Sequence, residues 1–236
     1  MQKVISIQPD KVQDSLRKHM LVDGFDMTLD LDKSNHGYLY DSKSNKYFLD
    51  FFTFVASNPL GMNHPKLNNQ EFINKIGKLA LNKPSLSDIY AQEQAEFVET
   101  FFNTAVPSYF KYSFYIEGGT LAVENAIKAA IDWKVQKNFA KGYKEEKGQQ
   151  IIHFKEAFHG RSGYTLSMTN TDPVKIAYFP KFKWPRISNP KVLFPLNDEN
   201  LSKVIEAEKQ SVAEINNAIA ENKDDIAAII LEPIQG

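Results

Sequence analysis

Hydrophobic residues follow a helical period most clearly from residue 120 onward. They recur at every fourth position, namely at Val123, Ile127, Ile131, Val135 and Phe139. This spacing places them in one stripe, because an α-helix has about 3.6 residues per turn. We therefore predict a long amphipathic helix that begins at Thr120.

The chain changes character just before this helix. Residues 114–116 are apolar and aromatic, and Gly118 and Gly119 follow them. We expect a strand, a glycine turn and a helix start in this order. Such a turn can bind a phosphate, because the first N–H groups of a helix lack internal partners and the helix dipole places positive charge there. Gly119 permits close approach of the backbone, and the Thr120 hydroxyl can cap the helix or bind an anion. For the motif alone, an ordinary structural turn is the simpler interpretation.

Other helices and strands are predicted along the rest of the chain. The helices span residues 10–21, 65–81, 89–105 and 201–220, with Ser87 or Asp88 as the cap of the third. The last helix carries apolar residues on one side, at Ile205, Val212, Ile215 and Ile219. Strands are predicted at 150–154, 192–194 and 226–231, and the last of these is apolar enough to be buried on both faces. Aromatic runs at 38–40 and 47–52 flank a turn-forming segment and predict a hairpin.

Strands alternate with helices after about residue 110, which predicts an α/β fold with a mainly parallel sheet and flanking helices. The part before it is expected to form a smaller appendage. Residues 57–65 are dense in turn formers and form a predicted loop, which either lines a site or connects two elements.

Composition narrows the class of protein. The 236 residues are 42% hydrophobic, enough for a substantial core. A net charge of −1 does not indicate a nucleic-acid partner, and the absence of cysteine excludes disulfides and thiolate metal sites. No apolar run approaches the roughly 20 residues of a membrane span, and the start does not resemble a secretory signal. We therefore expect a cytoplasmic protein without a nucleic-acid or membrane partner.

Two segments that follow predicted strands are candidates for chemistry. In one, Phe158 could stack on a flat heterocycle and Arg161 could pair with a carboxylate. A core phenylalanine and a structural ion pair explain these two residues equally well. In the other, Glu232 either faces a site or caps a backbone group. The five histidines form no close pair, so no metal site is expected.

Three segments, in this order, resemble the class III aminotransferases: IEGGTLAVENAIKAA, FHGRSGYTLS and IILEPIQG. These enzymes use pyridoxal 5'-phosphate on the fold type I scaffold, and the resemblance runs along essentially the whole chain. Within the family, the L-lysine 6-transaminase group is the most similar. The segments FFTFVASNPLGMNHP, NKPSLSDIY and TNTDPVKIAYFPKFKWPRI carry that finer resemblance.

The resemblance implies a set of cofactor contacts. Gly119 and Thr120 would bind the cofactor phosphate, Phe158 would stack on the pyridine ring, and Glu232 would lie close to that ring.

It also implies contacts to the substrates. Arg161 would bind a carboxylate of the amino-acid or oxo-acid substrate, and Val55 and Ala56 would contribute to the substrate pocket.

The implied reaction moves the ε-amino group of L-lysine to 2-oxoglutarate and gives the 6-semialdehyde and glutamate. Another ω-aminotransferase, acting on ornithine, 4-aminobutyrate or diaminobutyrate, and a non-catalytic cofactor-binding remnant are the alternatives. We expect residues 1–65 to belong to the small domain and the pocket loop, and residues 66–236 to form the first part of the large domain. No lysine here matches the family's Schiff-base lysine, so no catalytic residue is assigned. The expectation is therefore an N-terminal fragment, inactive alone, of a protein that is a homodimer when complete.

Overall fold

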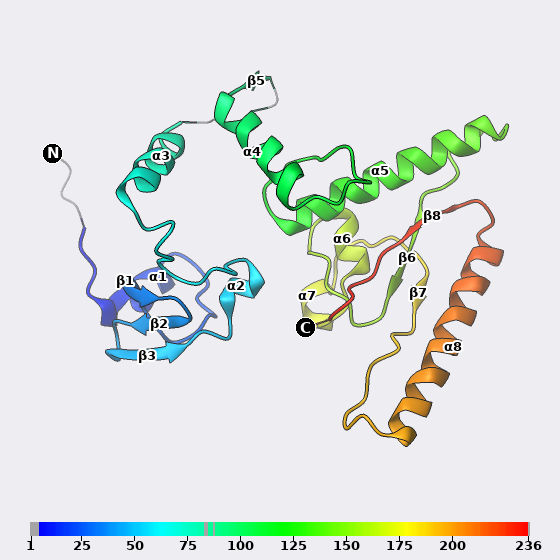
Figure 1. The fold of residues 1–236 in the computed structure, drawn as a ribbon. Coiled ribbons are helices and arrows are strands. Elements are labelled where there is room, and N and C mark those ends of the chain that lie inside the picture. Colours follow the sequence, from blue (N-terminus) through cyan, green and yellow to red (C-terminus); the bar gives the residue numbers. More distant parts are fainter. Residues whose placement is uncertain (1–4, 83–84, 87, 236) are drawn as a thin grey trace. The chain divides into compact units, whose positions relative to one another are not determined.

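The computed structural model describes residues 5–82, 85–86 and 88–235. They group into two compact units, one ending at Ser108 and the other beginning at Tyr109 (Figure 1). The division predicted at residue 65 concerns the two domains of the family and stays a prediction.

The first unit is built on a three-stranded antiparallel sheet. Its strands follow the chain in order, as β1 (Leu29–Asn35), β2 (Tyr38–Asp41) and β3 (Lys46–Leu49). The predicted hairpin is confirmed, since Tyr38 pairs with Leu49 and Asp41 with Lys46. Asp41 is only 2% exposed and fixes the hairpin turn. Burial alone would raise the pKa of Asp41, but hydrogen bonds from Ser44, Thr28 and Lys43 lower it to about 2.

Four α-helices also belong to the described part of this unit. They are α1 (Val12–Arg17), α2 (Thr53–Ala56), α3 (Gln70–Ala80) and α4 (Gln92–Thr104). The first is shorter than the predicted helix over 10–21, because Leu16 and Met20 are exposed and give that stripe nothing to pack against. The start of α3 is set by Asn69, whose side chain accepts a hydrogen bond from the N–H of Phe72.

The segment before α4 differs from the prediction. A two-residue pair, β4 (Ser85–Leu86) and β5 (Ile89–Tyr90), precedes the helix. The N-cap residue of α4 is Ala91, so Asp88 does not cap it; Ser87 lies outside the described residues.

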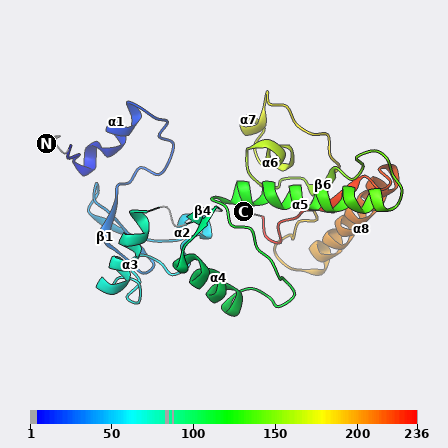
Figure 2. The same cartoon turned by 90° about the horizontal axis from the view of Figure 1, so that it is seen from above.

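A parallel sheet forms the centre of the second unit, in the order β7 (Arg186–Ile187), β6 (Gln150–Phe154) and β8 (Ile226–Ile229). Side chains alternate between its two faces. On one face Ile151 packs with Ile127 of α5 (Gly119–Ala140) and Met168 of α6 (Gly163–Met168). On the other face Ile152 packs with Ile187 and with Ala218 of α8 (Asp198–Glu221). Helices therefore cover both faces of the sheet (Figures 1 and 2).

Two predicted strands are absent. Residues 114–116 have no regular secondary structure and do not join the sheet, and Phe114 is 70% exposed. Residues 192–194 are irregular, and the third strand is instead β7, outside the predicted segments. An apolar run predicts a strand only where a second strand lies beside it, and the sequence pattern does not supply that neighbour.

The predicted apolar side of α8 is also largely wrong. Ile205, Val212 and Ile219 are 43%, 57% and 45% exposed, and only Ile215 packs against the core. The stripe that faces the sheet lies one position earlier, at Val204, Ser211 and Ala218. A serine is buried there because its hydroxyl donates to the carbonyl of Ser188 at 2.7 Å. The short helix α7 (Pro173–Ile176) completes the unit.

Candidate active site

The start of α5 has the features of an anion site. Its N-cap residue, Gly118, has a φ of 85° and no side chain with which to cap the helix. The expected cap by the Thr120 hydroxyl is not made. The first internal bond runs from the N–H of Ala122 to the carbonyl of Gly118, so the N–H groups of Gly119, Thr120 and Leu121 precede the helical ladder. A Cβ built on Gly118 or Gly119 meets no described atom within 4 Å, which leaves room for a ligand.

The loop between β6 and α6 lies directly against this helix start. Gly160 has a φ of 121°, and a Cβ on it would lie 2.5 Å from Oγ1 of Thr120 and 2.8 Å from Oγ1 of Thr165. Only glycine fits both the backbone angle and the space. The structure thus brings the segment that carries Phe158 and Arg161 to the predicted phosphate site.

Phe158 is not a core residue. Its side chain is 46% exposed, while its backbone N–H donates to Oε2 of Glu232 at 3.1 Å. Glu232 therefore does cap a backbone group, and it joins the end of β8 to the loop after β6. Arg161 is exposed and forms no ion pair within the part of the chain that the structure describes.

His159 was not singled out from the sequence, yet it is buried in this loop. It is 8% exposed, and its backbone N–H donates to Oγ1 of Thr169, which in turn donates to the carbonyl of Gly160. Its Nε2 is buried without a hydrogen-bond partner among the described residues. Burial lowers the pKa of His159, against the opposing effect of the Glu232 carboxylate, so the imidazole is neutral near pH 7. In the sequence, only its position next to Phe158 could have indicated that His159 belongs to the site.

Val55 and Ala56 belong to the first unit, in α2. All four residues of this short turn have positive φ, from 45° to 59°, so it winds in the left-handed sense. Side-chain oxygens hold it, since Oδ1 of Asp50 accepts the N–H of Thr53 at 2.7 Å and Oγ1 of Thr53 accepts the N–H of Ala56 at 3.2 Å. Val55 itself is 82% exposed.

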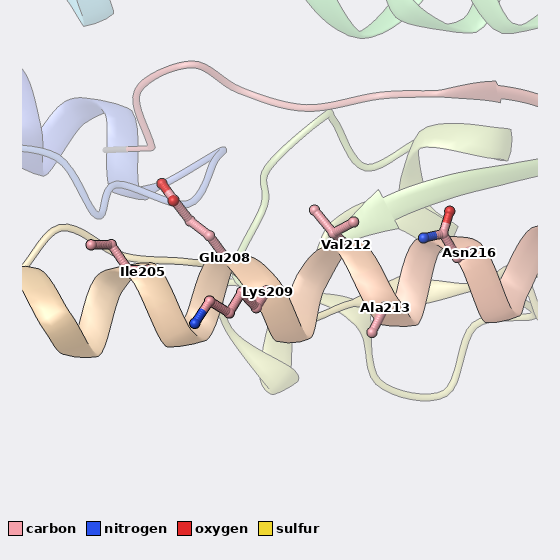
Figure 3. A pocket seen from close by; sticks show the side chains of 6 residues that line it. All are labelled: Ile205, Glu208, Lys209, Val212, Ala213 and Asn216. Carbon is pink, nitrogen blue, oxygen red and sulfur yellow. The ribbon is translucent and has the colours of Figure 1, made fainter.

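Two hollows on the second unit differ in their relation to these loops. One, of about 700 Å³, lies beyond the carboxyl ends of β6 and β8 and is lined in part by Glu156, Lys191 and Glu232. The other, of about 450 Å³, is lined only by residues of α8, which Figure 3 labels. Ligands in open α/β sheets bind beyond the carboxyl ends of the strands, where the first hollow lies. Of the predicted site residues, Glu232 lines this hollow, whereas Gly119, Thr120, Phe158 and Arg161 do not.

The residues that the structure describes show neither a metal cluster nor a membrane-spanning helix. They contain no group of three or more His, Asp or Glu side chains placed to hold a metal ion. None of their helices is both long and apolar enough to cross a membrane.

Comparison with known proteins then decides the family. The model of the class III aminotransferase family matches residues 21–236. The chain belongs to the class III aminotransferases. Among aminotransferases of this kind, it is 48% identical over 229 residues to the L-lysine-epsilon aminotransferase of Mycobacterium tuberculosis (strain ATCC 25618 / H37Rv), and this match covers 97% of the chain. The L-lysine-epsilon aminotransferase of Streptomyces clavuligerus is 43% identical and is matched over 98% of the chain.

Solved structures agree with this family assignment. The lysine aminotransferase from M. tuberculosis, in its internal aldimine form, is 46% identical and superposes with a TM-score of 0.91 over 98% of this chain. A transaminase from the marine bacterium Virgibacillus, at 18% identity and a TM-score of 0.73, shares the fold. The predicted fold class is thereby confirmed. The chain spans about half the length of these relatives, 50% of the curated M. tuberculosis and S. clavuligerus proteins and 52% of the solved lysine aminotransferase.

Proposed function

We propose that this chain provides the cofactor-binding part of an aminotransferase that moves the ε-amino group of L-lysine to 2-oxoglutarate. The products are the 6-semialdehyde and glutamate. The observation that carries the proposal is the 48% identity, over 97% of the chain, to an L-lysine-epsilon aminotransferase. Homodimer formation and a cytoplasmic location belong to the same proposal and rest on the sequence alone.

Pyridoxal 5'-phosphate is the proposed cofactor, and the residues present fit it. The uncapped start of α5 offers backbone N–H groups and open space at Gly118 and Gly119, which suits a phosphate. The exposed ring of Phe158 suits a flat heterocycle. When bound, the cofactor supplies an electron sink, which allows the C–H bond on the carbon that carries the amino group to be broken.

The chain's own residues take positioning roles toward the cofactor. Gly119 and Thr120 hold the phosphate with backbone N–H groups and a hydroxyl, close to the positive end of the α5 dipole. Phe158 would cover the pyridine ring of the bound cofactor. Glu232 fixes the backbone of Phe158 through the 3.1 Å hydrogen bond and would lie close to that ring.

Substrate recognition is assigned to other residues. Arg161 binds the α-carboxylate, so that the distant ε-amine of lysine reaches the reaction centre, since positioning supplies a large part of catalytic rate. Val55 and Ala56 line the substrate pocket. No residue of this chain is assigned a catalytic proton transfer.

A different amino donor is the second candidate. A relative named as a probable 4-aminobutyrate aminotransferase, from Caenorhabditis elegans, is 30% identical over 99% of the chain. This similarity supports another ω-amino acid as the alternative donor. The lower identity makes this candidate second to L-lysine.

The test is a donor panel on a full-length protein. This chain, fused to the portion of a class III aminotransferase that it does not span, is assayed with L-lysine, ornithine, 4-aminobutyrate and diaminobutyrate. We expect the highest kcat/KM for L-lysine. A higher value for any other donor overturns the substrate assignment.

A further inference from the structure

Glu124 of α5 makes three hydrogen bonds to one short segment. Its Oε1 accepts from Oγ of Ser162 at 2.9 Å and from the N–H of Thr165 at 3.0 Å. Its Oε2 accepts from the N–H of Tyr164 at 3.2 Å. These donors lie 38 to 41 residues further along the chain, at the start of α6.

This carboxylate adds to the local capping box of α6, in which Oγ1 of Thr165 accepts the N–H of Ser162 at 3.2 Å. N–H groups in the first turn of a helix have no internal partner, and negative charge is favourable there. The two helices also meet closely, because a Cβ on Gly163 would lie 3.2 Å from each Glu124 oxygen. The contact therefore fixes the start of α6 relative to α5.

The same face of α5 touches the loop at a second point. Glu124 follows Thr120 by four residues, so the two side chains lie one turn apart on one side of the helix. Thr120 contacts Gly160, and Ile127 continues that side into the core with Ile151 and Met168. The loop is thus held at Gly160 by Thr120 and at Ser162 by Glu124.

Arg161 stands between these two points of attachment, and Phe158 lies just before the first. We propose that Glu124 is a positioning residue for the cofactor, which it does not touch. It holds the loop from Phe158 to Arg161 at a fixed distance from the α5 start, so that one ligand reaches the phosphate site and the Phe158 ring together. The inference rests on the proposed function. A loop ordered before binding spares the ligand the cost of ordering it, which raises affinity.

The test compares Glu124→Ala and Glu124→Gln with a matched control, Asp132→Ala. Asp132 is an exposed carboxylate on the same helix, and its side chain has no hydrogen bond or ion pair to the described residues. The probes are pyridoxamine 5'-phosphate and pyridoxamine, titrated into the 236-residue chain and followed by fluorescence. Amide hydrogen exchange over residues 158–165 and thermal unfolding are measured on the same samples.

We expect the unaltered chain to prefer the phosphorylated probe. Glu124→Ala weakens binding of that probe about tenfold or more, equivalent to about 1.4 kcal/mol, and speeds exchange over 158–165. Glu124→Gln, which keeps an acceptor oxygen but loses the charge, gives an intermediate loss and still decides the matter if the alanine variant does not fold. Asp132→Ala changes neither quantity.

The outcomes separate the two proposals. Equal affinity of the unaltered chain for both probes overturns the proposed function and, with it, this role of Glu124. A phosphate preference that survives in both Glu124 variants overturns the role of Glu124 alone. A lower unfolding temperature with unchanged affinity of the folded protein also overturns it, because that is the result of a purely stabilising contact.

Discussion

Gly160 has almost no free space around it. Its missing side chain allows the loop after β6 to lie against Thr120, with both the backbone angle and the neighbouring oxygens excluding a Cβ. Any other residue at this position would lower the stability of the chain for two reasons, namely strain at positive φ and a clash of its Cβ with Thr120 and Thr165.

We predict that Gly160→Ala destabilises the chain by about 2–6 kcal/mol, since strain at positive φ and overpacking each cost about 1–3 kcal/mol. Gly142→Ala is the matched control. Its φ is 97°, but a Cβ there meets nothing within 4 Å, so it carries the backbone penalty alone. Urea unfolding of both variants measures the difference. Equal losses would show that Gly160 is not in close contact with Thr120.

Val55 gives the opposite prediction. A β-branched residue at a φ of 57° is strained, and its 82% exposure means that removing the side chain loses little burial. Val55→Gly should therefore raise the free energy of unfolding by about 1 kcal/mol. Val174→Gly is the control, because this valine is 83% exposed in α7 without positive φ, and the change should destabilise. Destabilisation by Val55→Gly would contradict the left-handed turn.

A buried histidine links two neighbouring strands. His153 of β6 is 1% exposed and accepts a hydrogen bond at Nε2 from Nε of Arg186 in β7, at 3.1 Å. Its Nδ1 then carries the proton and faces the carbonyl of Ile151 at 3.3 Å. Burial is the main cause that lowers the pKa of His153 to about 4, and the charge of Arg186 adds to it.

The free energy of unfolding should consequently decrease as the pH is lowered from about 6.5 to about 4. An unfolded histidine titrates near 6.5, and this one titrates near 4 when folded, so the unfolded chain binds more protons between these values. The stabilisation is complete above pH 6.5 and is lost as pH falls toward 4, by up to about 3 kcal/mol. Urea unfolding of the unaltered chain and of His153→Gln measures it. The His153→Gln variant should keep part of the dependence of its unfolding free energy on pH, because the pKa of His159 is also lowered. Identical slopes for the two proteins would contradict a buried neutral His153.

Elements with a strong local signal were predicted well. The strand at 150–154 and the helix that starts at the double glycine both occur, because apolar period and glycine position are local properties. The strands at 114–116 and 192–194 and the buried side of α8 depend on what lies beside them, which the pattern does not encode. The two-residue β7 likewise exists only because β6 pairs with it.

The candidate site divides in the same way. Its local motifs, Gly119-Thr120 and Phe158, could be singled out from the sequence because one begins a helix and the other follows a strand. Their roles toward a cofactor stay predictions. Glu124 and His159 were missed, since their significance comes from contacts with segments distant in the chain.

The chain as a whole spans about half the length of its lysine aminotransferase relatives. Large apolar side chains are exposed on it, among them Phe51 at 89% and Ile116 at 41%.

We predict that the chain alone, mixed with pyridoxal 5'-phosphate, L-lysine and 2-oxoglutarate, gives no glutamate, because none of its lysines is assigned to the cofactor. Measurable turnover in a glutamate assay would refute that assignment.

A structure of this chain with pyridoxamine 5'-phosphate tests the proposed cofactor site most directly. We predict the phosphate within hydrogen-bond distance of the N–H groups of Gly119 and Thr120, with the ring against Phe158. A phosphate bound elsewhere, or a ring turned away from Phe158, would contradict the proposed site.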